Sequence, residues 1–427
     1  MTYEDSLYYL QEIEEKKYSP DHTNSLNLMA YLGNPQYDMP VVHVAGTNGK
    51  GSTIAFIKSM LMAGGYNIGT FTSPHIISPR ELTHINDVSI GEGDFAASIT
   101  SIKEACDKMV VDGLNHPTQF ECLTAASLLY LSKSQLDLAL IEVGMGGRFD
   151  STNVFNKPLL AIITKVDYDH TAILGDTLAK IAWHKGGIIK PEVPTIIAHN
   201  NFEVIEAIST IVGETGHKLY LMDEGFIHEE ILMTTGNTKL FHLRSNFFEY
   251  KGLRTSMLGR HQTLNLCTAL LAIYQLRKKL PLTEPQIKEG ILHTHWHCRN
   301  DIVSIKPLIM VDGAHNPGAM NAIAAMLELN YPKHKVLTVL GMLSDKDTNL
   351  MLSKARSFSN QLILTNPISP RAKDSNTYSQ LEYELVIPDY KKALKKALSL
   401  TDDKTLILVL GSFYLTYPAK EWLIAHL

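Results

Sequence analysis

The sequence has few cysteines, no long run of like charge and no long apolar stretch. Its four cysteines are scattered among 427 residues without close pairing, which excludes a disulfide-rich secreted domain and predicts a reduced, cytoplasmic protein. No stretch reaches the roughly 18 uninterrupted apolar residues of a membrane span, and the acidic, amphipathic N-terminus is unlike a signal peptide. A net charge of −5 without a basic patch argues against nucleic acid or a membrane surface as partner.

Short, nearly continuous apolar runs alternate with helical patterns along the chain. Such runs are typical of strands buried on both faces of a parallel sheet, because regular alternation is expected only where one face is exposed. Helical patterns lie between many of them, for example at residues 53–62, 122–131 and 178–183. We therefore predict an α/β protein with open, mostly parallel sheets and helices on both faces. The predicted strands are Val41–Val44, Leu136–Val143, Leu159–Val166, Pro194–Ala198, Leu308–Val311, Val336–Leu340, Leu362–Thr365 and Leu406–Leu410.

The chain divides between two series of strands and helices. A helical pattern rich in Leu and Ala covers residues 259–276, and an independent strand–helix series begins at Leu308. A chain of this length is expected to form two or three domains. We predict a larger N-terminal domain at residues 1–296 and a smaller, Rossmann-like α/β domain at residues 297–427. Residues 224–256 are polar and partly strand-like, and we interpret them as an excursion from the first sheet.

A glycine-rich loop follows the first predicted strand, and residues 41–53 read V-V-H-V-A-G-T-N-G-K-G-S-T. Glycines let the backbone approach phosphate closely, and converging N–H groups with the start of a helix near Ser52 attract the anion. Lys50 would reach the outer phosphates, and a hydroxyl of Ser52 or Thr53 would bind phosphate or Mg²⁺. The strict G-x-x-x-x-G-K-[ST] pattern is not met, since Gly51 separates Lys50 from Ser52. We interpret the loop as a P-loop variant; a plain strand-to-helix turn is the alternative.

The loop and eight further segments resemble the folylpolyglutamate synthases and dihydrofolate synthases, relatives of the Mur ligases. Mur ligases usually carry a separate UDP-sugar domain before this loop, whereas only about 40 residues precede it here, which favours the folate branch. One such motif is weak, but the same order across most of the chain is highly specific. The further segments are T-S-P-H (72–75), P-T-Q-F-E (117–121), E-V-G-M-G-G-R-F-D-S-T-N (142–153), D-H-T-A-I-L-G-D-T (169–177), K-G-G-I-I-K (185–190), L-G-R-H-Q-T-L-N (258–265), D-G-A-H-N-P (312–317) and S-D-K-D (344–347).

The resemblance implies ATP and Mg²⁺, with two ions, as cofactors. Glu142 ends an apolar strand, where open α/β sheets place their ligands, and His170 follows the next strand. From the residues alone, Glu142 is also compatible with a strand-end salt bridge and His170 with a structural role. The implied metal ligands are Ser73, Glu142 and His170. The implied ATP-binding residues are Thr47, Asn48, Gly49, Lys50, Gly51, Ser52, Thr53, Asn265, Arg299 and Asp312.

The resemblance further implies Lys50, Lys185 and His315 as catalytic residues. Lys185 resembles a lysine that is carbamylated in this family, and a carbamate would turn a cation into an anion that supports the second metal. An unmodified Lys185 paired with an acid is the alternative. His315 would be positioned near the phosphates, although D-G-A-H-N-P is also compatible with an ordinary turn in which Asn316 starts a helix. Both interpretations of that motif can hold together.

A pocket for the pterin ring is implied on the other side of the site. Phe120 would stack on a flat ring, and Glu121 would accept its N–H groups. An apolar helix start with an acidic first turn is the alternative interpretation. The residues implied to bind this substrate are Thr118, Gln119, Phe120, Glu121, Asp150, Thr152 and Asn153.

One departure lies at the predicted domain junction. Family members typically show W-P-G-R there, whereas this chain has W-H-C-R at residues 296–299, and loss of Pro and Gly changes the freedom of the hinge backbone. If the stretch is extended, His293, His295 and His297 share one face beside Cys298, which is a candidate transition-metal site. Solvated linker histidines are the interpretation that we prefer.

The reaction implied by the resemblance is ATP-dependent amide ligation. The γ-phosphoryl group passes to a substrate carboxylate, the amine of L-glutamate attacks the acyl phosphate, and phosphate leaves. The expected acceptor is a folate such as tetrahydrofolate, with dihydropteroate as a further acceptor left open. A Mur-type ligase acting on a non-folate carboxylate and a nucleotide-binding protein without ligase activity are the alternatives. Only small-molecule partners are expected, with no nucleic acid or membrane, for a protein that acts as a monomer.

Overall fold

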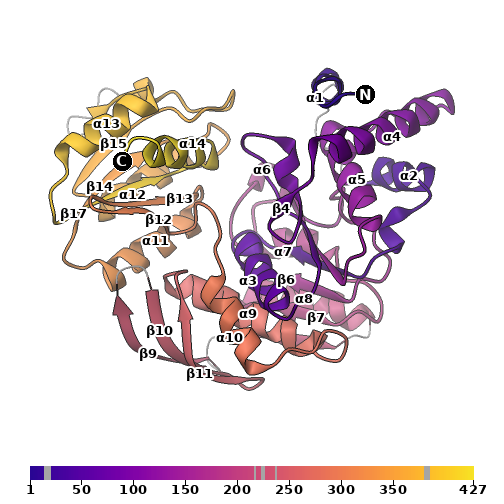
Figure 1. Ribbon diagram of the computed structural model, residues 1–427, viewed down its shortest axis with the longest axis horizontal. Helices are drawn as coiled ribbons and strands as arrows, with labels where there is room; N and C mark the ends of the chain where they lie inside the picture. The colour runs from indigo at the N-terminus through magenta and orange to yellow at the C-terminus, as the bar shows by residue number, and fades with distance from the viewer. Residues whose placement is uncertain (14–20, 216–217, 223–226, 236–237, 379–384) are drawn as a thin grey trace.

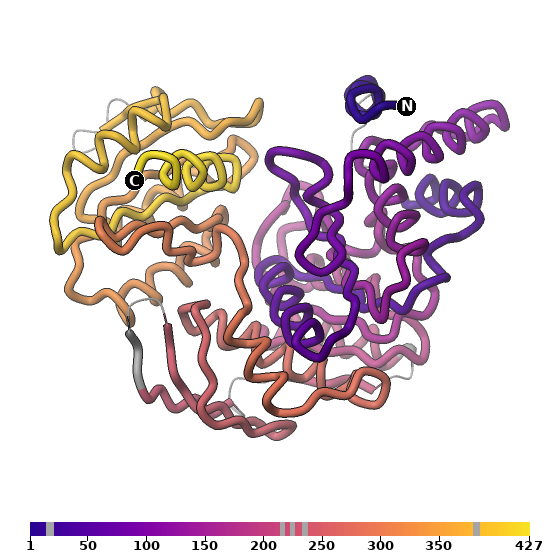
Figure 2. Tube along the Cα trace, viewed as in Figure 1, coloured from indigo at the N-terminus to yellow at the C-terminus, as the bar shows by residue number. Residues whose placement is uncertain are grey.

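The structure is a computed structural model in which two α/β domains lie side by side, with a small antiparallel sheet beneath them (Figures 1 and 2). The N-terminal domain runs from indigo through magenta to coral in both views, and the C-terminal domain from orange to yellow. The predicted fold class, open α/β sheets with a smaller C-terminal domain, is confirmed. No helix formed by the described residues is long and apolar enough to span a membrane. The described residues are 1–13, 21–215, 218–222, 227–235, 238–378 and 385–427.

The first sheet is mostly parallel and carries the glycine-rich loop. Its strand order is β4-β3-β2-β5-β1-β6-β7-β8, and only the pairs β2–β3 and β3–β4 are antiparallel. Val44 pairs with Glu142, so β1 and β5 end side by side. The strands are β1 (Val41–Ala45), β2 (Ile68–Phe71), β3 (Thr83–Ile85), β4 (Val88–Ser89), β5 (Leu138–Glu142), β6 (Leu160–Ile163), β7 (Thr195–Ile197) and β8 (Leu219–Leu221).

Helices cover both faces of this sheet, which explains why its central strands are apolar throughout. Successive side chains of a strand point to opposite faces. Val42 and Val44 accordingly pack in a core with α3 and α9, whereas Val41 packs in the core formed by α4 and α5. The helices are α1 (Tyr3–Glu12), α2 (Thr23–Tyr31), α3 (Lys50–Ala63), α4 (Glu92–Val111), α5 (Gln119–Ser132), α6 (Thr171–Leu174), α7 (Leu178–Gly186), α8 (Phe202–Thr215), α9 (Arg260–Leu276) and α10 (Glu284–His293), with 3₁₀ turns η1 (Pro35–Tyr37) and η2 (Pro79–Leu82).

The polar segment predicted as an excursion from the first sheet forms a separate antiparallel sheet. Its strands are β9 (His228–Thr235), β10 (Thr238–Arg244) and β11 (Glu249–Thr255), in the order β11-β10-β9. Phe241, Leu243 and Leu253 attach it to the core that contains α9. Residues 224–226 and 236–237 of the predicted segment lie outside the described residues.

The C-terminal domain has its own sheet, in the order β12-β13-β17-β14-β15-β16, with only the β12–β13 pair antiparallel. Two cores, one on each face, hold its helices against the sheet. The strands are β12 (Asp301–Ile305), β13 (Leu308–Asp312), β14 (Lys335–Leu340), β15 (Gln361–Leu364), β16 (Leu385–Val386) and β17 (Thr405–Leu410). The helices are α11 (Pro317–Asn330), α12 (Thr348–Phe358), α13 (Tyr390–Leu400) and α14 (Phe413–Ile424), with the 3₁₀ turn η4 (Ser375–Tyr378).

All eight predicted strands are present, as β1, β5, β6, β7, β13, β14, β15 and β17. The strands that prediction missed are short or lie in polar sequence, where periodicity carries little signal. The helix predicted to begin near Ser52 begins at Lys50, because Gly49 adopts a left-handed conformation and serves as its N-cap. The boundary between residues 296 and 297 stays a prediction.

Two cysteines that are distant in the sequence meet in the core. Cys106 in α4 and Cys122 in α5 place their sulfur atoms 3.9 Å apart, although the sequence suggested no close pairing. Packing of the two helices brings them together. All four cysteines are buried and free.

Candidate functional site

The glycine-rich loop joins β1 to α3 at the carboxyl edge of the first sheet. Gly46 and Gly49 have φ angles of 154° and 91°, which L side chains rarely adopt. A Cβ atom at Gly46 would clash with Thr164, and one at Gly49 would clash with the amide oxygen of Asn265 in α9. The glycines thus let the loop lie directly against the end of β6 and against Asn265 of α9, whose predicted role in binding ATP stays a prediction.

The backbone N–H groups of this loop fall into two sets. Those of Thr47 and Asn48 donate to the carbonyl of Lys165, at 2.8 and 3.0 Å, and are therefore used within the protein. The first N–H groups of α3 have no partner inside the helix by virtue of their position, and the helix dipole adds positive potential there. The buried hydroxyl of Thr53 also has no hydrogen-bond partner among the described residues. An anion is thus best accommodated at residues 49–53.

Lys50 and Glu142 face each other across the ends of β1 and β5. The Lys50 ammonium donates to the carbonyl of Gly46 at 3.1 Å and lies 3.6 Å from a carboxylate oxygen of Glu142, whose side chain is 7% exposed. Burial raises the pKa of Glu142, and the Lys50 ammonium, the Arg299 guanidinium and the Ser73 backbone N–H oppose that rise. A buried carboxylate with its cation at this distance is poorly compensated, so an added cation would be favoured there.

The predicted metal ligands fit Mg²⁺ by their chemistry. Glu142 offers a buried carboxylate, Ser73 lies close enough for its N–H to influence that carboxylate, and both line one cavity. His170 begins the short helix α6 with a φ of 51°. Burial lowers the pKa of His170 to about 4, so its imidazole is neutral at neutral pH and retains a lone pair for a ligand. Oxygen donors suit Mg²⁺ best, and an imidazole completes the predicted set.

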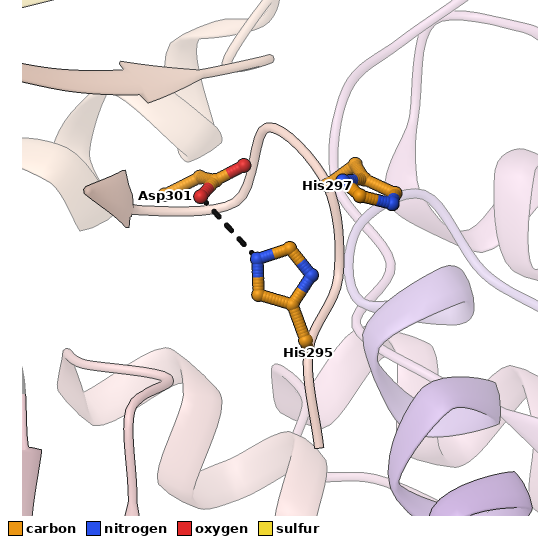
Figure 3. A group of neighbouring side chains, drawn as sticks. All are labelled: His295, His297 and Asp301. Carbon is orange, nitrogen blue, oxygen red and sulfur yellow. Dashed lines mark hydrogen bonds and ion pairs between the residues drawn. The ribbon is translucent and has the colours of Figure 1, made fainter. Parts of the chain in front are cut away.

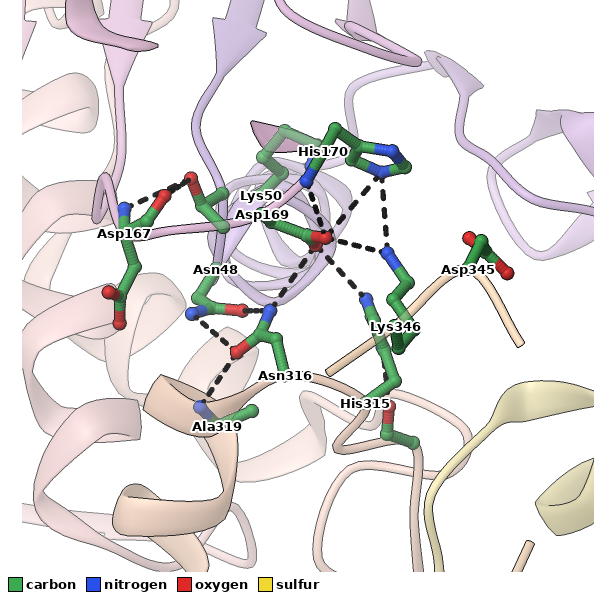
Figure 4. Close-up of polar contacts among 12 residues, drawn as sticks. Asn48, Lys50, Asp167, Asp169, His170, His315, Asn316, Ala319, Asp345 and Lys346 are labelled. Atoms are coloured by element: carbon green, nitrogen blue, oxygen red, sulfur yellow. Dashed lines mark hydrogen bonds and ion pairs between the residues drawn. The ribbon is translucent and has the colours of Figure 1, made fainter. Parts of the chain in front are cut away.

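A network of polar contacts connects the two domains beside the glycine-rich loop (Figure 4). Lys346 donates to the Asp169 carboxylate at 2.6 Å, and His315 Nε2 lies 3.7 Å from its other oxygen. Asn48 and Asn316 exchange two side-chain hydrogen bonds, at 3.3 and 3.0 Å, and the Asn316 amide also donates to Asp169 at 3.4 Å. The loop of one domain therefore contacts the D-G-A-H-N-P turn of the other directly.

The charge of Asp169 is the centre of this network. Burial raises its pKa, but the nearby His315 imidazole and the Lys346 ammonium outweigh burial and hold the pKa well below its usual range. Asp169, Lys346 and Asn316 were not singled out from the sequence as site residues. Each lies inside one of the family motifs, and that position was the only sequence feature that could have identified it. The contact among the three residues depends on how the two domains pack.

Lys185 is a buried residue near the end of α7. Lys185 is only 4% exposed, and its ammonium forms neither an ion pair nor a hydrogen bond within the part of the chain that the structure describes. Burial, followed by the charge of Lys50, lowers its pKa to about 7, while Asp169 and Asp150 oppose the shift. The alternative in which Lys185 pairs with an acid is not what the structure displays. Much of this amine is unprotonated, and thus nucleophilic, at neutral pH.

The C-terminal domain contributes Arg299, which lies just before β12, and Asp312, the last residue of β13. Asp312 accepts hydrogen bonds from the N–H groups of Asn300, at 2.7 Å, and Ala314, at 2.8 Å. Burial raises its pKa, and the Arg299 guanidinium opposes that rise. Arg299 itself lies 4.7 Å from the centre of the Phe413 ring. Asp312 thus shapes the turn after β13, and Arg299 lines the same cavity as Glu142.

A cavity of about 700 Å³ brings the two domains to one site. The start of α3 at Gly51, together with Ser73 and Glu142, lines it from the N-terminal domain; Arg299 and Phe413 line it from the C-terminal domain. None of the predicted pterin-binding residues is among the described residues that line it. The start of α3 and the metal-ligand candidates Ser73 and Glu142 therefore share a cavity that the predicted pterin pocket does not enter, and His170 is not among the described residues that line it.

The predicted pterin-binding residues at the start of α5 use their polar atoms within the protein. Thr118 and Glu121 form a capping box, in which the Thr118 N–H donates to the Glu121 carboxylate at 2.7 Å. The Gln119 amide donates to the carbonyl of Leu10 at 2.9 Å. Phe120 lies against the glycine turn, since a Cβ atom at Gly144 would approach its ring to 2.6 Å. The geometry is that of the alternative interpretation, a capped helix start, and a role in binding stays a prediction.

Asp150, Thr152 and Asn153 hold the turn that follows β5. Asp150 accepts hydrogen bonds from the N–H of Met145 at 2.8 Å and from the hydroxyl of Thr152 at 2.6 Å. The Asn153 amide donates to the carbonyl of Arg148 at 2.9 Å, whereas its own oxygen is buried without a partner among the described residues. Burial raises the pKa of Asp150 against these hydrogen bonds. Only the Asn153 oxygen is left for a further ligand.

Two family models match the chain. The Mur ligase middle domain covers residues 44–273, and the Mur ligase glutamate ligase domain covers residues 299–413. The first match begins within β1, the strand that leads into the glycine-rich loop, and the second begins at Arg299. Together they span the cavity from both sides.

Individual proteins are similar over nearly the whole chain. Dihydrofolate synthase/folylpolyglutamate synthase of Bacillus subtilis is 32% identical, with 91% of each chain covered. The structure of Mycobacterium tuberculosis folylpolyglutamate synthase complexed with ADP superimposes with a TM-score of 0.90 at 25% identity, covering 99% of this chain and 98% of the other. A folylpolyglutamate synthase complex with AMPPCP and folate gives 0.87 at 29% identity, covering 99% and 100%.

Proposed function

The chain belongs to the folylpolyglutamate synthase family of the Mur ligases, and on that premise we propose that it is an ATP-dependent ligase that adds L-glutamate to a folate. One observation carries this conclusion. The start of α3, Glu142 and Arg299 face a single cavity between the two domains. A reaction between two anions, ATP and a carboxylate, requires positive charge to offset their repulsion and binding surfaces on two domains that can align them.

The reaction proceeds in two balanced steps. A carboxylate oxygen of the folate attacks the γ-phosphorus of ATP, the bond to the β–γ bridging oxygen breaks, and ADP leaves with that oxygen. The amine of L-glutamate then attacks the acyl carbon, the carbon–oxygen bond to phosphate breaks, and the amine gives up a proton. The products are an amide, ADP and inorganic phosphate. Enclosure between two domains protects the acyl phosphate from water.

The protein's own groups position and neutralise these reactants. The first N–H groups of α3 and the Lys50 ammonium bind the phosphates, and Arg299 adds a cation from the C-terminal domain. His315 lies beside Asp169 at the same domain boundary and orients the phosphate end of the nucleotide. Ser73, Glu142 and His170 would hold Mg²⁺, which when bound neutralises phosphate charge during transfer.

We propose that Lys185 is carbamylated. Its neutral amine attacks the carbon of CO₂, one C–O π bond becomes a lone pair on oxygen, and the nitrogen loses a proton to give a carbamate. The lack of an acidic partner in the described residues and a pKa of about 7 both favour this reaction at neutral pH. The new anion would support a second Mg²⁺ and would pair with the Lys50 charge that otherwise repels Lys185.

We further propose residues 1–296 and 297–427 as the two domains of a monomer that closes on its substrates. Dihydropteroate is a second acceptor in this proposal, bound at the turn held by Asp150, Thr152 and Asn153 and at Phe120. The unpartnered oxygen of Asn153 is the polar atom there that supports such a site.

The test is ADP release from the purified protein with Mg-ATP and L-glutamate, with tetrahydrofolate or dihydropteroate added in parallel. Release with tetrahydrofolate supports glutamate addition to folates, and release with dihydropteroate supports the second acceptor. A Lys50→Met variant prepared in the same way measures any contaminating ATPase. Acceptor-independent ADP release, or none with either acceptor, would overturn the folate assignment.

A further inference from the structure

The hinge between α10 and β12 carries a cluster of three metal-ligand side chains. The ligand atoms of His295, His297 and Asp301 all lie within 4.8 Å of one another. Figure 3 shows His295 directed toward Asp301, with His297 on the same bend of the chain. The three-histidine face expected for an extended hinge is not formed, because His293 ends α10 and its ring contacts the carbonyl of Glu289 at 3.0 Å.

Asp301, and not His293, lies beside the two other histidines, whereas the preferred sequence interpretation was that all three histidines are solvated. Cys298 adopts a φ of 54°, which turns the chain sharply and brings the first residue of β12 back to the histidines. The Asp301 carboxylate accepts from the Cys298 N–H at 3.1 Å, and His295 Nε2 lies 3.3 Å from its other oxygen. The carboxylate is therefore buried and held by the backbone, whereas both imidazoles are exposed and accessible.

A positive charge already lies in this cluster. Lys420 of α14 donates to Asp301 at 2.6 Å, and its Nζ lies 3.0 Å from Nδ1 of His297. An ammonium has no acceptor, so His297 must present a lone pair to it. The cluster thus holds a cation between one carboxylate oxygen and one imidazole nitrogen, with the second imidazole beside them.

We propose that His295, His297 and Asp301 bind a divalent transition-metal ion of the zinc class, which displaces the Lys420 ammonium. Two imidazoles and one carboxylate with a water in the fourth position are a donor set that Zn²⁺ accepts in tetrahedral geometry. Imidazole ligands favour Zn²⁺, Co²⁺ and Ni²⁺ over Mg²⁺, whose preferred ligands are oxygens. Its three ligands are distinct from Ser73, Glu142 and His170, although His295 and His297 line the same cavity as Ser73 and Glu142.

Binding requires only a small rearrangement. Metal–ligand bonds of about 2.0 Å in tetrahedral geometry place ligand atoms about 3.3 Å apart. The His295–Asp301 pair is already at that distance, so His297 must approach and Lys420 must withdraw. The Lys420 side chain is only 13% exposed, but its four-carbon stem has several rotatable bonds, and His297 is exposed, so both groups can move by side-chain rotation.

The position suggests a consequence for the hinge. Trp296 lies between the two histidines in sequence, and a Cβ atom at Gly51 would approach its ring to 2.8 Å. A metal ion bound by residues 295, 297 and 301 would link both flanks of Trp296 to β12. It would thereby hold the hinge against the start of the phosphate-binding helix.

The test is a Co²⁺ titration of the full chain, followed by the visible absorption of tetrahedral Co²⁺, with saturating Mg-ADP present to occupy the catalytic site. We expect one Co²⁺ ion that Zn²⁺ displaces. The double variant His295→Ala/His297→Ala should lose this absorption. The matched control is His293→Ala, which removes a neighbouring histidine outside the cluster and should leave the titration unchanged.

A second variant keeps the proposal testable if the double variant folds poorly. Lys420→Met retains all three ligands and removes the competing ammonium, so Co²⁺ affinity should rise by about tenfold or more. Unchanged or weaker affinity in Lys420→Met would overturn the proposal. Equal Co²⁺ absorption in the wild type and in a folded double variant would overturn it as well.

Discussion

Two neighbouring parts of the N-terminal domain differ in how completely their buried charged groups are paired. At the phosphate-binding edge, Glu142 lies 3.6 Å from the nearest part of Lys50, and Lys185 forms no ion pair in the described structure. In the turn after β5, Asp150 accepts hydrogen bonds from Met145 and from both the N–H and the hydroxyl of Thr152. Both parts are buried, so the difference does not come from solvent.

This difference distinguishes buried charged groups that a bound ligand would pair from buried charged groups that stabilise the fold. A buried charge without a partner costs folding free energy, and it persists where a ligand completes its surroundings. A satisfied carboxylate contributes stability by fixing the turn. Substitutions at the first part should therefore reduce catalysis with little loss of stability, whereas substitutions at the second should reduce stability first.

The strongest test of this contrast is Lys50→Met. Loss of the ammonium removes charge that stabilises the transferring phosphoryl group, and we expect kcat to fall by about 10²- to 10³-fold. The free energy of unfolding should change by less than about 1 kcal/mol, since Lys50 is paired only weakly. Steady-state ADP release and urea unfolding measure the two quantities. Lys103→Met, an exposed lysine on α4, is the matched control, and near-wild-type kcat in Lys50→Met would break the comparison.

Asp150→Asn tests the other part. The asparagine side chain has one acceptor oxygen where the carboxylate has two, and its NH₂ group would face N–H and O–H donors that it cannot accept from. The free energy of unfolding should therefore fall by about 2–3 kcal/mol. Urea unfolding followed by circular dichroism gives this value. Asp176→Asn, at an exposed carboxylate that pairs with Lys180, should cost far less. If the two variants were equally stable, Asp150 would not be a structural anchor.

Lys185 predicts how stability depends on pH. Its pKa is about 7 in the folded protein and about 10.5 when unfolded, so between these values the unfolded state binds more protons and stability rises with pH. The contribution is about 1.4 kcal/mol per pH unit. Lys185→Met should be more stable than the wild type at pH 6, and this advantage should shrink as pH rises from 7 to 9.

This pH series requires buffers free of bicarbonate, because a carbamate would remove the titrating amine. Lys180→Met, on the exposed side of the same helix, provides the control and should show a pH-independent difference from the wild type. A constant difference for Lys185→Met across pH 6 to 9 would show that Lys185 is not an unpaired buried amine.

The smallest expected effect concerns the contact between domains. Lys346→Met removes the ammonium beside Asp169, and the pKa of Asp169 should rise while His315 still supports the carboxylate. Because that pKa starts well below its usual range, Asp169 stays ionised at neutral pH, and ADP release at pH 7 should show kcat/KM lowered by about tenfold or less. Lys354→Met, whose ammonium contacts the Asn321 side chain, is the control. A fall of about 1,000-fold or more would contradict this prediction, because it would make Lys346 as important as a group that stabilises the transferring phosphoryl group.

The sequence by itself determined eight of the buried strands, the glycine-rich loop and Glu142 at the end of a strand. These features follow from local rules: apolar runs mark buried strands, and glycines with a lysine after a strand mark a phosphate loop. The family motifs supplied the remaining candidates in order. Neither source contained the distances that decide which of these groups have partners.

Only the tertiary structure showed that Lys346 meets Asp169 across 177 residues and that Asn48 meets Asn316 across 268. It also showed that Asp301, and not His293, lies beside His295 and His297 at the hinge, and that Cys106 lies against Cys122. Such contacts depend on how two sheets and their helices pack, and no local propensity encodes a separation of that length. Whether a buried charge is satisfied or left for a ligand is a property of that packing, because its partners arrive from distant parts of the chain.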